Sequence, residues 1–389
     1  MLRPVSFNVL HVDTERGWRG GERQTLWLAQ ELARRGYGSV VAARAGEPLA
    51  RRSREVGLDQ VDCSPASELD FRAALALRKV IQTRRIDLVH AHTAHAVAVA
   101  ALATMRLEVP LVVARRVDFK LRTNVGTRLK YGRAKMFVAV SNAVARVLET
   151  GGIAPARVRV VPDGVDVHRR ITPASRATLD ALDIAPEAPI VVQVAQLVGH
   201  KDPVNFVRAI SRARQLIPDV QALLVGDGSL RPDVEREIHN LDLDDVVRLT
   251  GYRTDADELL AAADVACLAS REEGMGSVLL DALLLGIPIA ATRAGGIPEI
   301  VAHDETGLLV EARNPMALGD AIARLIEDAS LRDRLAAAGR ARVIDFSVER
   351  MTDRTVDVYE EVLNRVGAVR RSRTSPASSS SSVSVTGAP

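Results

Sequence analysis

Residues 270–288 read SREEGMGSVLLDALLLGIP, and the interpretation of the whole sequence starts from this stretch. It follows an apolar run that is typical of a buried strand. After a loop with an acidic pair and two glycines, the leucine spacing predicts a helix that begins near Ser277 and stops at Gly286. Glycines let a backbone approach a ligand closely, and helix N-termini attract anions. The stretch therefore fits either a phosphate-binding site with Glu273 and Asp281 beside it or an ordinary strand–loop–helix unit.

Length and composition narrow the class of protein. A chain of 389 residues is long enough for two domains that each bury a core. The net charge of +3 is too small to indicate a nucleic-acid partner. Cys63 and Cys267 lie in or beside apolar strand patterns, as buried thiols of a reducing compartment do. With no signal-peptide pattern at residues 1–4 and no apolar run of about 18 residues, we expect a cytoplasmic enzyme or binding protein.

Short apolar strands alternate with helices through both halves of the chain. This alternation is typical of parallel sheets covered on both faces. The pattern restarts after a segment at residues 172–189 that is rich in Pro and Ala, as a linker would be. We therefore predict two doubly wound domains that face each other, with ligands between them at the carboxyl ends of the strands. The expected units are a first domain at 1–172, a second at 173–345, a helix at 346–367 that crosses back to the first domain, and a disordered serine-rich tail at 368–389.

The order of motifs resembles the retaining glycosyltransferases of the GT-B fold, and specifically glycosyltransferase family 4. The resemblance covers nearly the whole chain up to about residue 366, and it rests on the ordered set rather than on any single motif. It implies an α/β fold of two facing Rossmann-like domains, the first for the acceptor and the second for a nucleotide-sugar donor. The motifs are Gly20-Gly21, DLVHAH at 87–92, VAVS at 138–141, VVPDGVD at 160–166, Lys201, GDG at 226–228, AAAD at 261–264, the stretch at 270–288 and GGIPE at 295–299.

The family's acidic motif is a Glu, seven intervening residues and a second Glu. Here the two positions hold Glu273 and Asp281. The resemblance implies that Glu273 contacts hydroxyls of the donor sugar and that position 281 holds the ribose hydroxyls. Because Asp281 is one methylene shorter than Glu, a charged hydrogen bond worth about 1.5–3 kcal/mol is at risk, and we expect weaker nucleotide binding. The other donor-binding residues implied in this loop are Gly274, Met275, Gly276, Ser277 and Val278, with N–H groups near 276–278 facing the leaving diphosphate.

A second departure from the family is Gln196, where an Arg is usual. In the family that Arg and a later Lys neutralise the leaving diphosphate, so the role falls here to Lys201; a solvated lysine at a helix start is the alternative. Gly20-Gly21 follows the first strand and either lets the backbone approach the diphosphate or forms only a tight turn. Tyr252 and Arg253 lie where the family cradles the base.

His92 is the third candidate catalytic residue, beside Glu273 and Lys201. The resemblance places it near the donor sugar and the acceptor hydroxyl. A zinc site made by His90, His92 and His95 is one alternative, and a histidine satisfied at a strand end is another. Because no nearby Cys or acid pair completes a tetrahedral set, we expect no metal and no other cofactor.

A basic segment at residues 119–135 holds six Lys and Arg side chains and no acid. It fits either a solvated face or a surface for an anionic acceptor or an acidic membrane leaflet, which would place the protein at the inner face of a membrane.

The sequence as a whole predicts a metal-independent, retaining glycosyltransferase of the hexosyltransferase type. Its donor would be a nucleotide-diphosphate sugar and its acceptor a glycan or glycolipid, in envelope polysaccharide or glycolipid synthesis. Two alternatives stay open. One is a weakened or non-catalytic homologue that binds sugar nucleotides, motivated by Gln196 and Asp281, and the other is a GT-B sugar-nucleotide epimerase.

Overall fold

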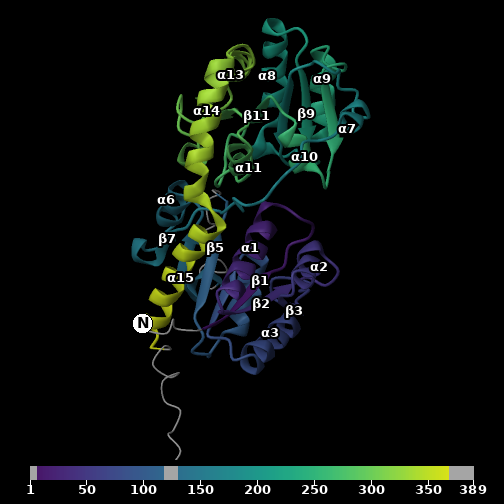
Figure 1. Cartoon of the computed structure of the whole chain (residues 1–389). Coiled ribbons are helices and arrows are strands. Elements are labelled where there is room, and N and C mark those ends of the chain that lie inside the picture. The colour runs from purple at the N-terminus through teal and green to yellow at the C-terminus, as the bar shows by residue number, and fades with distance from the viewer. Residues whose placement is uncertain (1–6, 118–129, 368–389) are drawn as a thin grey trace, which may run out of the picture.

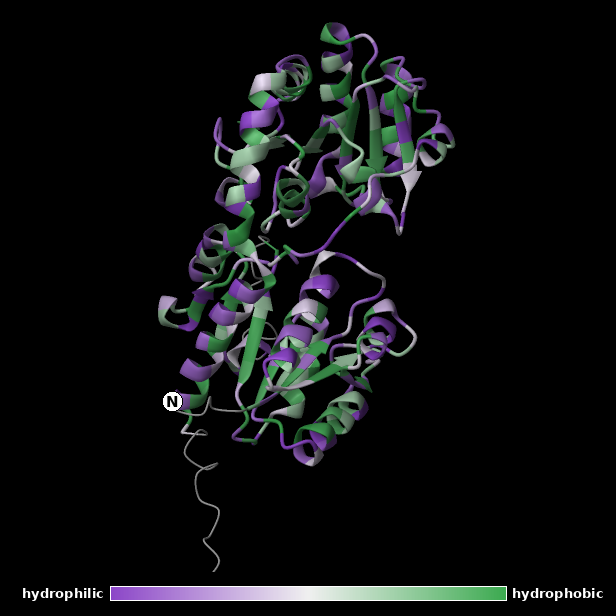
Figure 2. Cartoon of the chain, in the orientation of Figure 1, coloured by the Kyte–Doolittle hydropathy of each residue, from purple (hydrophilic) through white to green (hydrophobic). Residues whose placement is uncertain are grey.

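The computed structural model describes residues 7–117 and 130–367 of the chain. The serine-rich tail and residues 119–129 of the basic segment lie outside these ranges, so their predicted properties stay predictions. Two α/β domains follow each other along the chain, and the C-terminal helix returns to the first (Figure 1). Hydrophobic residues are concentrated on the strands of both domains (Figure 2). Within the described ranges, no helix combines the length and apolar character needed to cross a membrane.

The first domain contains a seven-stranded parallel sheet in the order β3-β2-β1-β4-β5-β6-β7. Its central strands are runs of Val, Leu and Ala because both faces of the sheet are buried. The order reverses between β1 and β4, and a switch point of this kind opens a binding crevice at the carboxyl ends of the strands. The strands are β1 (Asn8–Asp13), β2 (Gly38–Ala43), β3 (Asp59–Asp62), β4 (Leu88–Ala91), β5 (Leu111–Arg115), β6 (Ala134–Ala139) and β7 (Val158–Val160).

Helices cover both faces of this sheet, and several begin at a side-chain cap. Asp70, Thr93 and Ser141 each accept a hydrogen bond from a backbone N–H in the first turn of the helix that follows. The helices are α1 (Gly20–Arg34), α2 (Pro48–Glu55), α3 (Phe71–Thr83), α4 (Ala94–Ala103) and α6 (Asn142–Thr150), with a 3-10 turn η1 (Pro155–Arg157).

The second domain repeats the plan with a six-stranded parallel sheet in the order β10-β9-β8-β11-β12-β13. Its switch point lies between β8 and β11. The strands are β8 (Ile190–Val194), β9 (Gln221–Val225), β10 (Val247–Gly251), β11 (Val265–Leu268), β12 (Ile289–Thr292) and β13 (Leu308–Val310). The helices are α7 (Arg176–Asp180), η2 (Gly199–Lys201), α8 (Pro203–Leu216), α9 (Arg231–Asn240), α10 (Ala256–Ala261), α11 (Val278–Leu285), α12 (Ile297–Ile300), α13 (Pro315–Glu327), α14 (Ala329–Arg342) and η3 (Val343–Phe346).

The last helix, α15 (Val348–Arg365), packs on the first domain. Figure 1 shows α14 and α15 running in succession along one side of the molecule. The buried face of α15 joins the first domain's core, where Tyr359 meets Phe7 edge-on with ring centroids 5.9 Å apart. A strand-like bridge between Val165 and Ser347 fixes the point at which the chain returns. The helix therefore ties the end of the second domain to the first.

Candidate active site between the two domains

Two helix N-termini meet where the domains face each other. A Cβ built at Gly20, the first residue of α1, would lie 2.8 Å from Ser277 Oγ, at the start of α11. No side chain caps α11. The first N–H groups of a helix have no partner within it, and they carry the positive end of the helix dipole. The two N-termini therefore offer donors to one place, as an anion-binding site requires.

The loop before α11 packs against the first domain. Ser141 Oγ donates a hydrogen bond of 2.6 Å to the Gly274 carbonyl, and the Asp163 backbone N–H donates to Met275 Sδ over 3.1 Å. A Cβ at Gly274 would lie 1.9 Å from the Arg116 carbonyl oxygen, so only glycine fits there. The predicted donor-binding residues Gly274 and Met275 thus also form the contact between the domains.

Glu273 and Lys201 lie together at the carboxyl ends of the second domain's strands. Lys201 Nζ forms an ion pair with Glu273 Oε2, and Ser270 Oγ donates to the same oxygen over 3.1 Å. Glu273 is buried. An ammonium group has three N–H donors, so Lys201 can hold Glu273 and a phosphate oxygen at once. Two of the three predicted catalytic residues are therefore in direct contact.

Asp281 lies at the centre of a charged cluster that joins the domains. Its Oδ2 accepts from Arg23 Nη2 at 2.5 Å and its Oδ1 from Arg169 Nη2 at 2.6 Å. The same two arginines reach Asp257, at 3.6 and 2.7 Å. Burial raises the pKa of Asp281, and Arg23 and Arg169 oppose that rise. A carboxylate has about four lone-pair sites, so a ribose hydroxyl would have to share Asp281 with two guanidinium groups.

Arg23 and Arg169 were not predicted as site residues from the sequence. The position of Arg23 offered a signal, since it lies one turn into the helix that Gly20-Gly21 opens. Arg169 follows the PDGVD motif and gives no such signal.

His92 is buried in a cluster with His11 and His90. Its Nε2 lies 3.1 Å from His11 Nδ1, and Arg116 Nη1 donates to its Nδ1 over 3.3 Å. His90 Nδ1 lies 2.6 Å from the Tyr359 hydroxyl. Burial is the main reason why the pKa of each of the three histidines is lowered. The pKa of His11 falls to about 3, and those of His90 and His92 fall well below the usual value. The three rings are therefore neutral at neutral pH.

The histidines that come together differ from the three considered as an alternative zinc site. His95 is largely exposed and lies 3.9 Å from Glu15, while His11 takes the third place. One ring nitrogen from each of His11, His90 and His92 can lie within 4.8 Å of the others. The Arg116 guanidinium against His92 opposes a second cation, and no carboxylate belongs to this group among the described residues. These residues therefore fit a metal ion poorly.

The remaining predicted donor residues lie around the edge of this region. Gln196 is half-buried in the turn after β8. Tyr252 is 61% exposed, and Arg253 forms a two-bond ion pair with Asp255 at 2.6 and 2.8 Å. No contact of the described residues decides whether Tyr252 and Arg253 cradle a base, so that role stays a prediction.

Part of the basic segment serves the fold. Lys130 forms a 2.5 Å ion pair with Glu68, and Arg133 Nη2 donates to the carbonyls of Thr104 and Leu107. Lys135 is exposed. Two of the six cations are thus already paired, while three others lie outside the described residues.

Glu22 gives this region a testable pH dependence. Burial raises the pKa of Glu22 to about 7, with the nearby Asp13 acting in the same direction. A carboxyl whose folded pKa exceeds its unfolded value makes the folded state less stable as pH rises through that interval. We expect wild type to lose about 2–3 kcal/mol of unfolding free energy between about pH 5 and 8 relative to Glu22→Gln, measured by urea denaturation.

The Gln side chain is the matched control for that measurement. It can still accept the 2.7 Å hydrogen bond from the Arg19 backbone N–H that caps α1. The buried histidines are the same in both proteins, so their contribution to the pH dependence cancels in the comparison. Parallel pH curves for the two proteins would show that Glu22 is ionised in the fold.

Solved structures share this two-domain architecture. HepE of Anabaena in complex with UDP and glucose matches with a TM-score of 0.80, over 91% of this chain and 99% of that chain, at 23% identity. A glycosyltransferase from Rickettsia africae matches with a TM-score of 0.80 over 92% of this chain and 99% of that one, at 23% identity. The class defined by two facing parallel-sheet domains is the GT-B fold, which confirms the predicted fold.

Family comparisons cover both domains. Residues 18–169 match Glycosyltransferase Family 4, and residues 176–342 match Glycosyl transferases group 1. This chain therefore belongs to the group 1 glycosyltransferases of the GT-B fold, enzymes that use nucleotide-sugar donors.

Two curated relatives show the range of the family. N-acetyl-alpha-D-glucosaminyl L-malate synthase of Bacillus anthracis is 24% identical over 86% of this chain and 92% of its own length. The GDP-mannose-dependent alpha-(1-6)-phosphatidylinositol monomannoside mannosyltransferase of Mycobacterium tuberculosis is 35% identical over 48% of this chain and 50% of its own length. The names differ in both sugar and acceptor, so neither substrate transfers to this chain from similarity alone.

Proposed function

We propose that this protein is a metal-independent, retaining glycosyltransferase that moves a hexosyl group from a nucleotide-diphosphate sugar to a hydroxyl of a glycan or glycolipid. The proposed setting is envelope polysaccharide or glycolipid synthesis at the cytoplasmic side of a membrane. The observation that carries the proposal is the meeting of the α1 and α11 N-termini beside the Lys201–Glu273 pair. The backbone N–H groups of the two helices and the Lys201 ammonium converge on one place, as the stabilisation of a departing diphosphate requires.

In the proposed reaction the protein supplies charge and orientation. Lys201 and the helix N–H groups hold the diphosphate as the bond from the sugar's anomeric carbon to the phosphate oxygen breaks. The acceptor hydroxyl attacks that carbon from the same face, and its proton passes to a diphosphate oxygen. Glu273 holds the sugar hydroxyls. The contact between Lys201 and Glu273, two of the predicted catalytic residues, supports this reaction. The Asp281 cluster instead favours the alternative of a weakened homologue, because both Asp281 oxygens already accept hydrogen bonds from arginines.

Calorimetric binding of UDP, GDP, ADP and CDP, each with and without EDTA, tests the proposal. We expect selective binding of one nucleotide that EDTA does not change. Asp281→Glu lengthens the acid by one methylene, and we expect it to bind that nucleotide about tenfold more tightly if position 281 faces the ribose. Absence of binding by every nucleotide in both proteins would overturn the proposal. Transfer of labelled sugar to an acceptor extract would exclude the non-catalytic rival.

We also propose peripheral contact with an anionic membrane surface, through the basic segment at 119–135 and the neighbouring helix α3. Leu69, Phe71 and Leu75 are 64–69% exposed at the start of α3. Residues 71–85 hold five Lys and Arg and no acid, whereas Leu69 lies between Glu68 and Asp70. Apolar side chains among cations are typical of helices that lie in a membrane interface.

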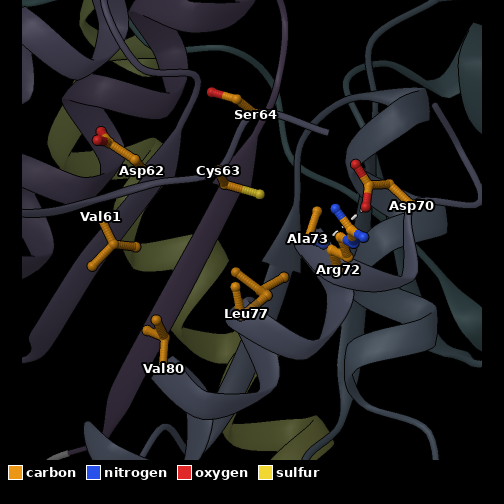
Figure 3. A pocket seen from close by; sticks show the side chains of 10 residues that line it. Val61, Asp62, Cys63, Ser64, Asp70, Arg72, Ala73, Leu77 and Val80 are labelled. Carbon is orange, nitrogen blue, oxygen red and sulfur yellow. Dashed lines mark hydrogen bonds between the residues drawn. The ribbon is translucent and has the colours of Figure 1, made fainter. Parts of the chain in front are cut away.

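Other contacts support that surface. The Lys130–Glu68 ion pair holds Lys130 of the basic segment beside the start of α3. A pocket of about 310 Å³ opens between β3 and α3, and Figure 3 shows Val61, Leu77 and Val80 on its apolar side. The lining also contains the polar side chains Asp62, Ser64, Asp70 and Arg72, so only its apolar side extends the surface that a lipid chain could contact.

Vesicle binding tests the membrane contact. We expect Phe71→Ser combined with Leu75→Ser to lower the partition coefficient to anionic vesicles about tenfold or more, because both apolar side chains lose their transfer free energy. Sedimentation with vesicles gives the measurement. Val56→Ser, which removes a residue that is 42% exposed next to α2, is the matched control. Equal binding to neutral and anionic vesicles, or no effect of the double change, would contradict the contact.

A further inference from the structure

We propose that Arg116 is a positioning residue that fixes His92 as the tautomer with its proton on Nε2, in a one-way hydrogen-bond chain from Arg116 through His92 to His11. The inference rests on the proposed function for its catalytic meaning but not for its test. In this arrangement His92 lines the site as a neutral side chain and does not accept a proton.

The direction of the chain follows from the donor at its start. A guanidinium group has only N–H donors, so His92 Nδ1 must accept the 3.3 Å hydrogen bond from Arg116 Nη1. A neutral imidazole with a bare Nδ1 carries its proton on Nε2. That proton points at His11 Nδ1, 3.1 Å away, which must then accept. His11 in turn carries its proton on Nε2, a buried atom with no partner among the described residues.

The surroundings hold Arg116 in place. Arg116 Nε donates to Asp163 Oδ1 over 3.1 Å; Arg116 follows β5 and Asp163 follows β7, two strands that are separated in the sheet by β6. The Arg116 carbonyl lies against Gly274 of the donor loop. The side chain of Arg116 is therefore held by Asp163 and its backbone lies against Gly274, next to the predicted donor site.

The hydrogen-bond chain prevents His92 from taking up a second proton. A proton on Nδ1 would face the Arg116 donor, and the other charged or titratable groups around the ring are His11, His90 and, beyond Arg116, Asp163. Both ring nitrogens of His92 are used inside the protein. The proton of the acceptor hydroxyl must therefore go elsewhere, as it does in the proposed transfer to the diphosphate.

Nitrogen spectra of the full chain labelled with ¹⁵N-histidine test the tautomer directly. The chain has eight histidines, and the spectrum of His92→Gln assigns the signals of His92. We expect wild-type His92 to show a protonated Nε2 and a bare Nδ1, with no titration between about pH 5 and 9. A protonated Nδ1, or titration in that window, would overturn the proposal. The measurement needs no turnover, so a failure to find transfer activity leaves it intact.

Two variants of Arg116 separate positioning from general packing. Arg116→Gln retains an N–H donor, and we expect it to keep the wild-type tautomer. Arg116→Met removes the donor, and we expect His92 to populate both tautomers or to titrate. Unchanged His92 signals in a folded Arg116→Met protein would contradict the assignment. If Arg116→Met fails to fold, the wild-type and Arg116→Gln spectra still show whether His92 carries its proton on Nε2.

Kinetics supply a second readout once a donor and acceptor are known. Because His92 lines the site, we expect His92→Gln to lower kcat, but by less than the loss of a general base would. Loss of a general base would lower kcat by about 10²–10⁴, whatever residue replaced it. A drop of that size in His92→Gln would show that His92 accepts the proton.

Discussion

Replacing Asp281 with alanine is expected to lower the free energy of unfolding by about 3–5 kcal/mol, because it removes the buried carboxylate and leaves two partly buried guanidinium groups with only the exposed Asp257 as an acidic partner. Asp281 is 1% exposed and holds Arg23 at 2.5 Å and Arg169 at 2.6 Å. The intact cluster gives little net stability, since burial of the charges opposes their attraction. Removing one charged member lowers the free energy of unfolding by much more than the intact cluster contributes to it. Urea denaturation at neutral pH measures the loss.

Asp257 provides the matched control within the same cluster. Its side chain is 39% exposed, and it pairs with the same two arginines at 3.6 and 2.7 Å. We expect Asp257→Ala to cost less than about 1 kcal/mol, because solvent screens an exposed pair. Similar losses for the two variants would show that the buried position of Asp281 has no special weight.

The fold was largely predictable because apolar runs and helix periods mark buried elements. The alternation of short apolar strands with helices predicted the second sheet, whose central strands are buried on both faces. The edge of the first sheet carries no such signal. Strand β3 has the sequence DQVD, which has one apolar residue, and it pairs with a single neighbour. An edge strand needs little apolar surface, so hydrophobicity gives no signal for it. Helix α7 in the expected linker was missed for a similar reason, being five residues long.

The site was predictable only where a motif carried it. Glu273 and Lys201 were found through the resemblance, and the structure places them in contact. Arg23 and Asp281 are 258 residues apart, so no local spacing could pair them. His11 faces His90 because β1 and β4 are neighbours in register, and this order is a property of the sheet. His95 was adjacent in sequence but lies in the first turn of α4, where its side chain is largely exposed.

Replacing Lys201 with methionine is expected to lower kcat/KM for sugar transfer about 10²–10³-fold. Methionine has a similar length but no charge, so the departing diphosphate loses a preorganised cation. The family resemblance places Gln196 where a second cation is usual, which leaves Lys201 as the charged group predicted for this role. The Lys201–Glu273 ion pair places the ammonium next to the acid proposed to hold the sugar. The loss should therefore appear mainly in the chemical step.

Two comparisons separate the charge of Lys201 from its support of Glu273. Lys201→Arg keeps the charge in a different geometry, and we expect it to lose less activity than Lys201→Met. The methionine variant should also weaken binding of the selected nucleoside diphosphate more than that of its monophosphate, because the charge acts on the terminal phosphate. Equal weakening of both would show that Lys201 acts only through Glu273, and a melting curve like that of wild type would exclude unfolding as the cause.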